Sequence, residues 1–305
     1  MSSTVSTLVV CWNNREFLGR CLESVPSDSQ LIVVDNASAD GSADVVAERF
    51  PAAHLIRNSV NVGFAAGVNQ AAAVATGDYL LLLNPDAEAT PRSVERLVTF
   101  LDEQTTTGAA AGRLLSMTEE PQNDFHARRL PTVASLAADL LLVSRVWPGN
   151  PVTKHAAAVD LDRSRPGLVE QSAASCLLVR RAAFDAVGGM DEQFTPAWFE
   201  DVDLCKRLLD RGWAIYYVPN AIFRHIGGVS VGTLGRVRQK RIYYRNMERY
   251  VRKHHGRTGA AAVKALLVTG MGLRVAGSAL IWDRDGLYAF AGVLGGTLSG
   301  WKGGD

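Results

Sequence analysis

Two aspartates directly follow apolar runs in the first third of the chain. Asp86 closes the run YLLLLNPD at residues 79–86, and Asp35 follows the run LIVV at residues 31–34. Four consecutive leucines are typical of a strand covered on both faces, and Pro85 ends that strand because it cannot donate to the sheet ladder. Ligands of open α/β sheets bind beyond the carboxyl ends of the strands. Asp86 therefore suits a metal ion or a phosphate-bound metal, and Asp35 a hydrogen bond from a nucleobase or ribose, with turn and helix-capping residues as the alternative.

A third polar cluster, NVGFAAGVN at residues 61–69, opens a predicted helix. Asn61 and Gly63 precede the helix, and Asn69 lies in its first turns. Glycine at a helix start lets a ligand approach the backbone amides, and a helix N-terminus favours an anion such as a diphosphate. Tight packing of helix on sheet through Ala and Gly explains the same residues, and the dinucleotide fingerprint GxGxxG is missing.

An acidic pair begins a predicted helix in the second half of the chain. Glu200 and Asp201 precede the apolar positions Leu204 and Leu208, and Gly212 ends the helix. The helix macrodipole stabilises negative charge at this end. The residues alone therefore favour ordinary first-turn acids.

The elements that position these residues alternate between strands and helices. Strands are predicted at residues 4–11, 31–34, 54–57, 79–83 and 172–181, and helices at residues 15–25, 44–50, 65–75 and about 133–146. In the N-terminal half, this alternation predicts a parallel, doubly wound sheet.

Composition sets the outer limits of the interpretation. The chain has 305 residues, is 47% hydrophobic and carries a formal net charge of +1. It is long enough for one large domain or two small ones, and its near-neutral charge argues against a general nucleic-acid binder. The four cysteines show no metal-type spacing, which predicts free thiols in a reducing compartment. No secretory signal is visible.

The series VVDNASADGS, NVGFAAGVNQ and GDYLLLLNPDA resembles the nucleotide-sugar-binding half of family 2 inverting glycosyltransferases, and within them the rhamnosyltransferase-like group. The resemblance covers about residues 4–255. It implies an α/β GT-A fold, a Rossmann-like mixed sheet flanked by helices, with a helical C-terminal extension. The implied catalytic domain is 1–232, with a nucleotide-sugar-binding half at 1–115 and an acceptor half at 116–232, followed by helices at 233–305.

The same resemblance implies roles for single residues. It implies that Asp35 contacts the nucleobase of the donor and that Asp86 binds a divalent metal that bridges the donor diphosphate. It also implies a wider set of residues that bind the nucleotide sugar, namely Asn13, Asn36, Asn61, Gly63, Asn69 and Asn84. Arg181 is a further candidate for the donor phosphates, with capping of its strand at the surface as the equal alternative. The Asp-x-Asp of the family is Asn84-Pro85-Asp86 here, so one carboxylate is lost and a further ligand is needed. His225, expected in a glycine-rich loop, is the candidate, and oxygen-rich coordination suits Mg²⁺ or Mn²⁺.

The stretch FEDVDLCKRLLDRGW resembles the Glu-Asp motif of these transferases. The resemblance implies that Asp201 is the general base for the acceptor hydroxyl and that Glu200 orients the acceptor or holds Asp201. Asp203 is expected to be structural. The helix N-terminus is expected to keep the pKa of Asp201 low, so that its basicity comes from desolvation. One in-line displacement then inverts the anomeric centre.

The C-terminal part indicates a membrane surface. Residues 236–257 carry nine Arg or Lys against one acid, with three tyrosines between them. A basic amphipathic helix beside the apolar stretch 266–282 is typical of in-plane or re-entrant membrane association. At 17 residues that stretch is marginal as a span. We expect a cytoplasmic protein, peripheral at the inner face of the plasma membrane, with packing against the catalytic domain or an oligomer interface as the alternative.

The expected reaction moves a sugar from a nucleoside-diphosphate donor, with dTDP-rhamnose favoured, to a lipid-linked or polysaccharide acceptor in cell-envelope glycan synthesis. The alternatives are a UDP- or GDP-sugar with another acceptor, or a non-catalytic nucleotide-sugar-binding scaffold. The irregular segment 119–166 is expected to recognise the acceptor. Its candidate contacts to an acceptor diphosphate are Phe125, His126, Arg128 and Arg129.

Overall fold

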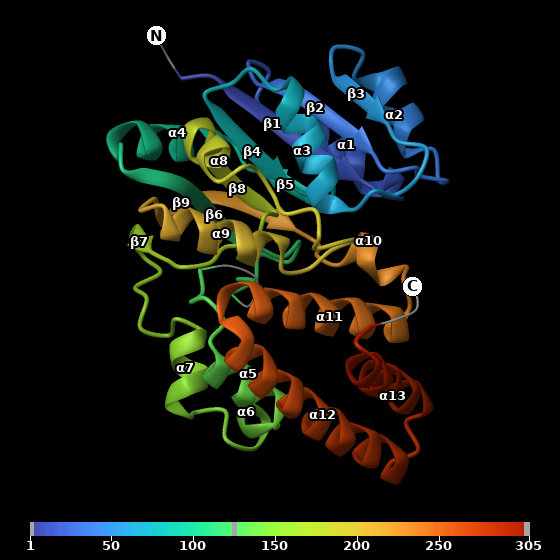
Figure 1. Ribbon diagram of the computed structural model, residues 1–305. Coiled ribbons are helices and arrows are strands. Elements are labelled where there is room, and N and C mark those ends of the chain that lie inside the picture. The colour runs from blue at the N-terminus through green and yellow to red at the C-terminus, as the bar shows by residue number, and fades with distance from the viewer. Residues whose placement is uncertain (1–2, 124–126, 302–305) are drawn as a thin grey trace. The chain divides into compact units, whose positions relative to one another are not determined.

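The computed structural model describes residues 3–123 and 127–301, which form two compact units (Figure 1). Unit 1 comprises the residues up to 128, together with 161–196 and 200–230. Unit 2 comprises 129–160, 197–199 and the residues from 231 onward. The segment 129–160, which lies within the expected acceptor half, thus clusters with the C-terminal helices.

Unit 1 is built on a nine-stranded sheet. Its order is β3-β2-β1-β4-β8-β6-β9-β5, with β7 beside β9. The strands are β1 (Val5–Cys11), β2 (Gln30–Asp35), β3 (His54–Arg57), β4 (Tyr79–Leu83), β5 (Ala87–Ala89), β6 (Thr107–Leu115), β7 (Gly167–Leu168), β8 (Cys176–Arg180) and β9 (Ala214–His225). The helices of this unit are α1 (Arg15–Glu23), α2 (Ser42–Arg49), α3 (Phe64–Val74), α4 (Ser93–Glu103), α8 (Arg181–Ala186) and α9 (Glu200–Asp210).

The first four strands form the parallel part of the sheet. β1 pairs in parallel with both β2 and β4, and β2 pairs in parallel with β3. All five residues of β4 are buried, as the leucine run predicts, because strands on both sides and helices on both faces exclude water from it. α3 packs against β1 and β2, while α4 packs against β6 and β9. The alternation of strands and helices that the sequence predicts is therefore confirmed for this part.

The sheet is mixed because β8 and β5 run against their neighbours. β8 pairs antiparallel with β4, so that Cys176 lies opposite Leu83 and Arg180 opposite Tyr79. The start of β8 therefore meets the carboxyl end of β4. The parallel sheet expected from alternation alone misses this reversal, whereas the resemblance to GT-A proteins implies a mixed sheet.

Unit 2 is helical. Its helices are α5 (Val133–Leu140), α6 (Val143–Val146), α7 (Pro151–Ala156), α11 (Arg236–His254), α12 (Gly256–Leu280) and α13 (Arg284–Ser299), with the short α10 (Val229–Gly232) at the passage from unit 1. The single helix expected near 133–146 is divided because Leu142 adopts a left-handed conformation with φ 61°. Thr132 and Ser135 form a capping box at the start of α5. Within unit 2, Trp301 Nε1 donates to Glu248 at 2.9 Å, which ties the end of the described chain to α11.

The pairing of β6 with β9 depends on a glycine. Gly112 lies where their register shifts, and a Cβ at this position would lie 2.5 Å from the Ala221 oxygen and from the Phe223 ring. Gly112→Ala should therefore lower the free energy of unfolding by about 2 kcal/mol, because neither a strand backbone nor a packed ring can move aside cheaply.

Urea unfolding followed by circular dichroism measures this change. Gly272→Ala in α12 is the control, since its Cβ would meet nothing within 4 Å. We expect it to be neutral or to stabilise by about 0.5–1 kcal/mol through its better helix propensity. Equal effects of the two substitutions would contradict the close approach at Gly112.

Candidate functional site

Polar residues gather at the carboxyl edge of the parallel strands. Asp35 is the last residue of β2, Asn13 follows β1 and Asp86 follows β4. Because these strands are parallel, their carboxyl ends lie on one edge of the sheet. A hollow of about 490 Å³ opens there, lined by Asn13, Asn14, Arg15, Glu16, Phe17, Asp40 and Val229.

Asp35 organises the first turn at this edge. Its side chain is buried and accepts hydrogen bonds from the backbone of Ser38 at 3.1 Å and from the Cys11 thiol at 3.3 Å. Asn13 has φ 56°, and its side-chain oxygen accepts from the amide of Ala39 at 2.8 Å. These bonds fix the shape of the turn after β2, and Asp35 keeps further lone pairs for a ligand.

A second group of amides fixes the entry to α3. Asn36 Nδ2 donates to the Gly63 carbonyl at 3.1 Å, and Asn61 accepts from the Gly63 amide at 2.9 Å. Gly63 has φ 92°, and a Cβ there would lie 2.8 Å from Thr195 Oγ1 and 3.3 Å from Pro196. Only glycine fits this crossing of two loops, so the backbone at the start of α3 has a set position.

Two predicted donor contacts are engaged in structural bonds. Both polar atoms of the Asn69 side chain bind the backbone of Met190 at 2.9 Å, and its Nδ2 also donates to Glu192. Arg181 donates to the carbonyls of Gly77 at 3.0 Å and Ala75 at 2.7 Å. These carbonyls precede β4, at the edge opposite to Asp86. This position favours the structural alternative for Arg181, because β8 runs antiparallel and carries its last residues to the amino ends of the parallel strands.

Asp86 and His225 form the centre of the polar edge. His225 Nε2 lies 3.5 Å from Asp86 Oδ1 and 3.4 Å from Asn84 Nδ2, and both the His225 and Asp86 side chains are about 5% exposed. Burial alone would raise the pKa of Asp86, but the hydrogen bond and charge of His225, with the amide of Gly227 at 3.0 Å, outweigh it and lower the pKa. The carboxyl is therefore held ionised.

His225 occupies a strand end instead of the expected glycine-rich loop. It is the last residue of β9, where it lies opposite Ala87 of β5. This antiparallel pairing places the histidine one residue from Asp86 across the two strands. A strand fixes a side chain better than a loop, so the arrangement of Asp86 and His225 is set in advance.

Gln122 is a functional candidate that sequence reasoning missed. Its Nε2 donates to the His225 carbonyl at 2.6 Å, and its Oε1 lies 3.0 Å from His225 Nδ1. A carbonyl only accepts, so the amide orientation is settled and Nδ1 must carry the proton. Nε2 is then the ring nitrogen that faces Asp86. Nothing in the local pattern PQND indicates this, because the contact spans 103 positions.

The acidic pair begins α9, as predicted. Burial raises the pKa of Asp201 to about 6, although the amides of Val202 and Ala174 oppose the shift. The expectation that the helix N-terminus keeps this pKa low is thus wrong, because removal from water outweighs the amide bonds. Burial and the neighbouring Asp201 also raise the pKa of Glu200 well above its ordinary value. Asp203, as expected, is structural: it is fully buried and paired with Arg207 at 2.7 Å.

A short backbone stretch connects the acidic pair to the Asp86 cluster. The Ala174 amide hydrogen bonds Asp201, and the next carbonyl, that of Ser175, accepts from the Asn84 amide at 3.2 Å. Among the described residues, three buried polar atoms along this path have no hydrogen-bonding partner: Ser172 Oγ, Ser175 Oγ and Glu200 Oε2. Buried polar groups are rarely left unpaired, so these three atoms are candidates for a bond to water or to a ligand.

The capacity of this edge for a metal is limited. Within residues 3–123 and 127–301, no group of three or more His, Cys, Asp and Glu side chains is arranged to hold an ion. Asp86 and His225 Nε2 are two candidate ligands, and Asn84 adds an amide beside them. Such a set fits a partly hydrated divalent cation that takes its other ligands from a bound phosphate.

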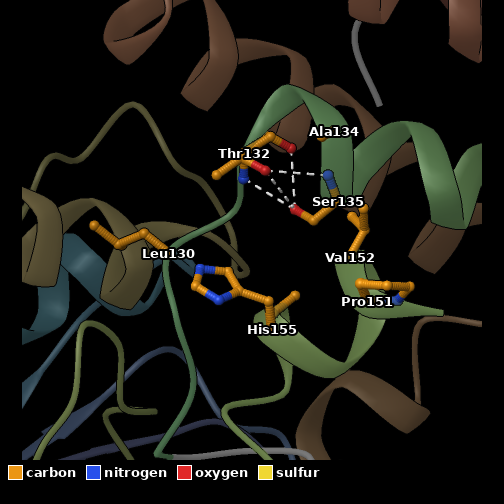
Figure 2. Close-up of a pocket in the computed structure, with 8 residues that line it drawn as sticks. Leu130, Thr132, Ala134, Ser135, Pro151, Val152 and His155 are labelled. Carbon is orange, nitrogen blue, oxygen red and sulfur yellow. Dashed lines mark hydrogen bonds between the residues drawn. The ribbon is translucent and has the colours of Figure 1, made fainter. Parts of the chain in front are cut away.

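Unit 2 has an apolar pocket of its own. It has a volume of about 250 Å³ and is lined by Leu130, Thr132, Ala134, Ser135, Pro151, Val152, His155 and Ala156. Figure 2 shows that the hydroxyls of Thr132 and Ser135 bond to each other and to the start of α5. No carboxylate lines the pocket, so it is chemically unlike the edge described above.

The expected acceptor contacts divide between the two units. Arg128 pairs through its backbone with Gln171, and Arg129 forms an ion pair with Asp160 at 2.5 Å. Phe125 and His126 lie outside the described residues.

Comparison with known proteins gives a consistent result. The model of the family described as "Glycosyl transferase family 2" matches residues 6–186. An N-acetylglucosaminyl-diphospho-decaprenol L-rhamnosyltransferase from Mycobacterium tuberculosis is 30% identical over 76% of this chain and 79% of its own length. The rhamnosyltransferase WbbL from Escherichia coli is 25% identical over 70% of this chain and 80% of its own length. Among solved structures, the mannosyltransferase PcManGT from Pyrobaculum calidifontis, in complex with GDP-Man and Mn²⁺, has a TM-score of 0.55 and 14% identity, covering 98% of this chain and 87% of that one.

The role of Gln122 has a direct test. In the wild type, the ¹⁵N shifts of His225 should show a protonated Nδ1. Gln122→Ala should give a mixture of the two ring tautomers, because the acceptor at Nδ1 is removed. Gln30→Ala is the control, since Gln30 bonds Ser6 and Thr76 at the amino edge of the sheet. An unchanged His225 spectrum in Gln122→Ala would contradict the assignment.

Proposed function

The chain belongs to glycosyl transferase family 2, and on this premise we propose that it transfers rhamnose from dTDP-rhamnose to a lipid-linked or polysaccharide acceptor, with inversion at the anomeric carbon, in cell-envelope glycan synthesis. The enzyme is a glycosyltransferase with the GT-A fold. Relatives named as rhamnosyltransferases, at 25–30% identity, support rhamnose as the sugar, and one of them is named for a diphospho-decaprenol acceptor.

The observation that carries the proposal is the continuous polar path from Asp86 and His225 through Asn84, Ser175 and Ala174 to the acidic pair. Nucleotide-sugar transfer needs a place for the leaving diphosphate and a base for the incoming hydroxyl, close to one another. The path joins an ionised carboxylate and a histidine to a buried acidic pair through two consecutive residues. Asp35 and the amides around Gly63 then belong to the nucleoside and diphosphate ends of the donor.

Mg²⁺ or Mn²⁺ is proposed to bind at Asp86 and His225. Bound there, the ion supplies Lewis-acid stabilisation of the charge that develops on the leaving nucleoside diphosphate. Gln122 keeps the His225 proton on Nδ1 and so leaves Nε2 as a ligand. Asn84 in place of a second carboxylate leaves one negative charge at this position instead of two.

Asp201 is proposed to be the general base. With its pKa at about 6, it is mostly ionised near neutral pH yet basic enough to accept a proton from the acceptor hydroxyl in the transition state. The raised pKa of Glu200 keeps the neighbouring carboxyl preferentially protonated, so that the pair does not concentrate two charges. Glu200 then orients the acceptor or Asp201 through a hydrogen bond. We also propose a cytoplasmic location, peripheral at the inner face of the plasma membrane, where lipid-linked acceptors are available.

The base assignment is tested by Asp201→Asn. The amide keeps the size of the side chain but accepts no proton, so transfer from dTDP-rhamnose should fall by at least about 100-fold while donor affinity measured by calorimetry stays near that of the wild type. Asp210→Asn is the matched control, because Asp210 ends the same helix, is exposed and pairs with Lys206. Normal transfer by Asp201→Asn would show that Asp201 is not the general base. Transfer by the wild type only from UDP- or GDP-sugars would show that dTDP-rhamnose is not the donor.

The pKa of Asp201 also sets the pH dependence. A base acts in its ionised form, so the transfer rate should rise with pH through about 6 and level off above it. The residual rate of Asp201→Asn should lack this acidic limb. A wild-type rate that stays constant as the pH falls through this value would contradict the assignment.

The metal assignment is tested by His225→Ala. Loss of one protein ligand should raise the Mn²⁺ concentration needed for half-maximal transfer by at least about tenfold, and calorimetry of Mn²⁺ binding in the presence of dTDP should show the same weakening. His54→Ala is the control, since His54 is exposed at the start of the edge strand β3. An unchanged Mn²⁺ titration would remove His225 from the metal site.

A further inference from the structure

From Ala261 onward, helix α12 has no exposed charged side chain, unlike an ordinary surface helix. It is 25 residues long, and by length and composition it is able to cross a membrane, although 28% of its most apolar stretch is buried within the structure. Ten residues from position 261 to 282 are exposed: Ala261, Ala262, Ala265, Thr269, Leu273, Ala276, Ala279, Leu280, Ile281 and Trp282. None of them carries a charge, whereas exposed helix faces in water usually do.

The opposite face of α12 is committed to packing inside unit 2. Val263, Leu267 and Met271 are fully buried. Arg274 donates to the carbonyl of Asp139 at 2.8 Å and to that of Leu140, which ties α12 to the end of α5. These contacts occupy one side of the helix and are lost if α12 is surrounded by lipid. The geometry therefore favours contact with a membrane along one face over a complete crossing.

The turn between α12 and α13 is the most apolar exposed point. Leu280, Ile281 and Trp282 are 81%, 75% and 85% exposed, and Tyr288 in the next helix is 66% exposed. Beyond its first turn, α13 exposes Tyr288, Ala291, Gly295 and Leu298 together with Ser299, again without a charge. Trp and Tyr are the residues that favour the boundary between lipid and water. In Figure 1 this turn lies at the lower end of α12 and leads into α13.

Positive charge borders this apolar face. Arg236 at the start of α11 forms an ion pair with Asp283 in the turn at 3.3 Å, which places the start of α11 beside this turn. The exposed cations at the start of α11 and in the turn are Arg236, Arg238 and Arg284, and Arg257 is exposed at the other end of α12. The nearby acids are Asp283, which is paired with Arg236 and caps α13, and the exposed Asp285.

We propose that the exposed faces of α12 and α13, with the tip Leu280-Ile281-Trp282, form a docking surface for an anionic lipid bilayer. The inference rests on the membrane location proposed above and names the surface that serves it. The tip enters the acyl boundary, and the bordering arginines meet lipid phosphates. A second copy of the chain is the less favoured occupant, because its own arginines would be brought against those of the first.

Vesicle flotation with the full chain tests the surface. The probes are vesicles of phosphatidylcholine alone and vesicles of equal parts phosphatidylcholine and phosphatidylglycerol. The wild type should bind the anionic vesicles and release them at high salt, because the arginine contribution is screened. The double variant Leu280→Glu with Ile281→Glu should bind them at least about tenfold more weakly, since two apolar side chains are replaced by charges that the bilayer excludes.

The matched control is the double variant Val159→Glu with Leu168→Glu. These two residues are 64% and 63% exposed and lie outside α12 and α13, so the same change of charge should leave vesicle binding as in the wild type. Brominated lipids should also quench a part of the tryptophan fluorescence that Trp282→Phe removes. Both double variants should keep the far-ultraviolet spectrum of the wild type, and Leu280→Glu with Ile281→Glu should also keep its dTDP-rhamnose turnover in vesicle-free assays.

Each opposing outcome overturns a defined part. Failure of the wild type to bind either vesicle would remove the membrane location itself, without touching the transfer reaction. Wild-type vesicle binding by Leu280→Glu with Ile281→Glu would place the membrane surface elsewhere. A dimer in light scattering that becomes a monomer in that variant, with no vesicle binding by the wild type, would assign the face to a second copy of the chain.

Discussion

The antiparallel pairing of β8 with β4 is the constraint on which the polar edge depends. Four leucines bury β4 so completely that a neighbour on each side is required, and β8 fills one side in reverse. The amino end of β8 therefore meets the carboxyl end of β4. This brings residues 172–175 beside Asn84 and, through the Ala174 amide, to the start of α9. One strand direction thus joins residues that are more than 100 positions apart in the chain.

The same constraint explains what the sequence predicts well and where it fails. Local patterns suffice for the leucine strand, for the acids at the ends of β2 and β4, and for the acidic pair at the start of α9, because burial and capping are local properties. The choice between the two roles of Arg181 cannot be made from local patterns, since strand direction is decided by distant partners. The role of Gln122 is not predictable from the sequence for a similar reason, because the contact forms only when β9 brings His225 beside it. The pKa of Asp201 depends on burial, which a helix position alone does not reveal.

Asn84 and Gln122 both contact the ring of His225. Gln122 fixes the proton on Nδ1 of His225, and Asn84 presents an amide nitrogen to Nε2 at 3.4 Å. An aspartate at position 84 would place a second carboxylate beside Nε2, next to that of Asp86. Asn84 therefore leaves this edge with one carboxylate, that of Asp86, beside the histidine.

The chain passes between the two units five times, after residues 128, 160, 196, 199 and 230. Unit 2 therefore cannot be removed by a single truncation, even though most of it follows the sheet in the sequence. A shortened protein that ends at residue 230 would still contain the insert 129–160 without the helices that cover it, and would expose the apolar sides of α5. Evolutionary loss or exchange of the C-terminal helices would have to be matched by changes in the insert, so the two segments are expected to have been inherited together.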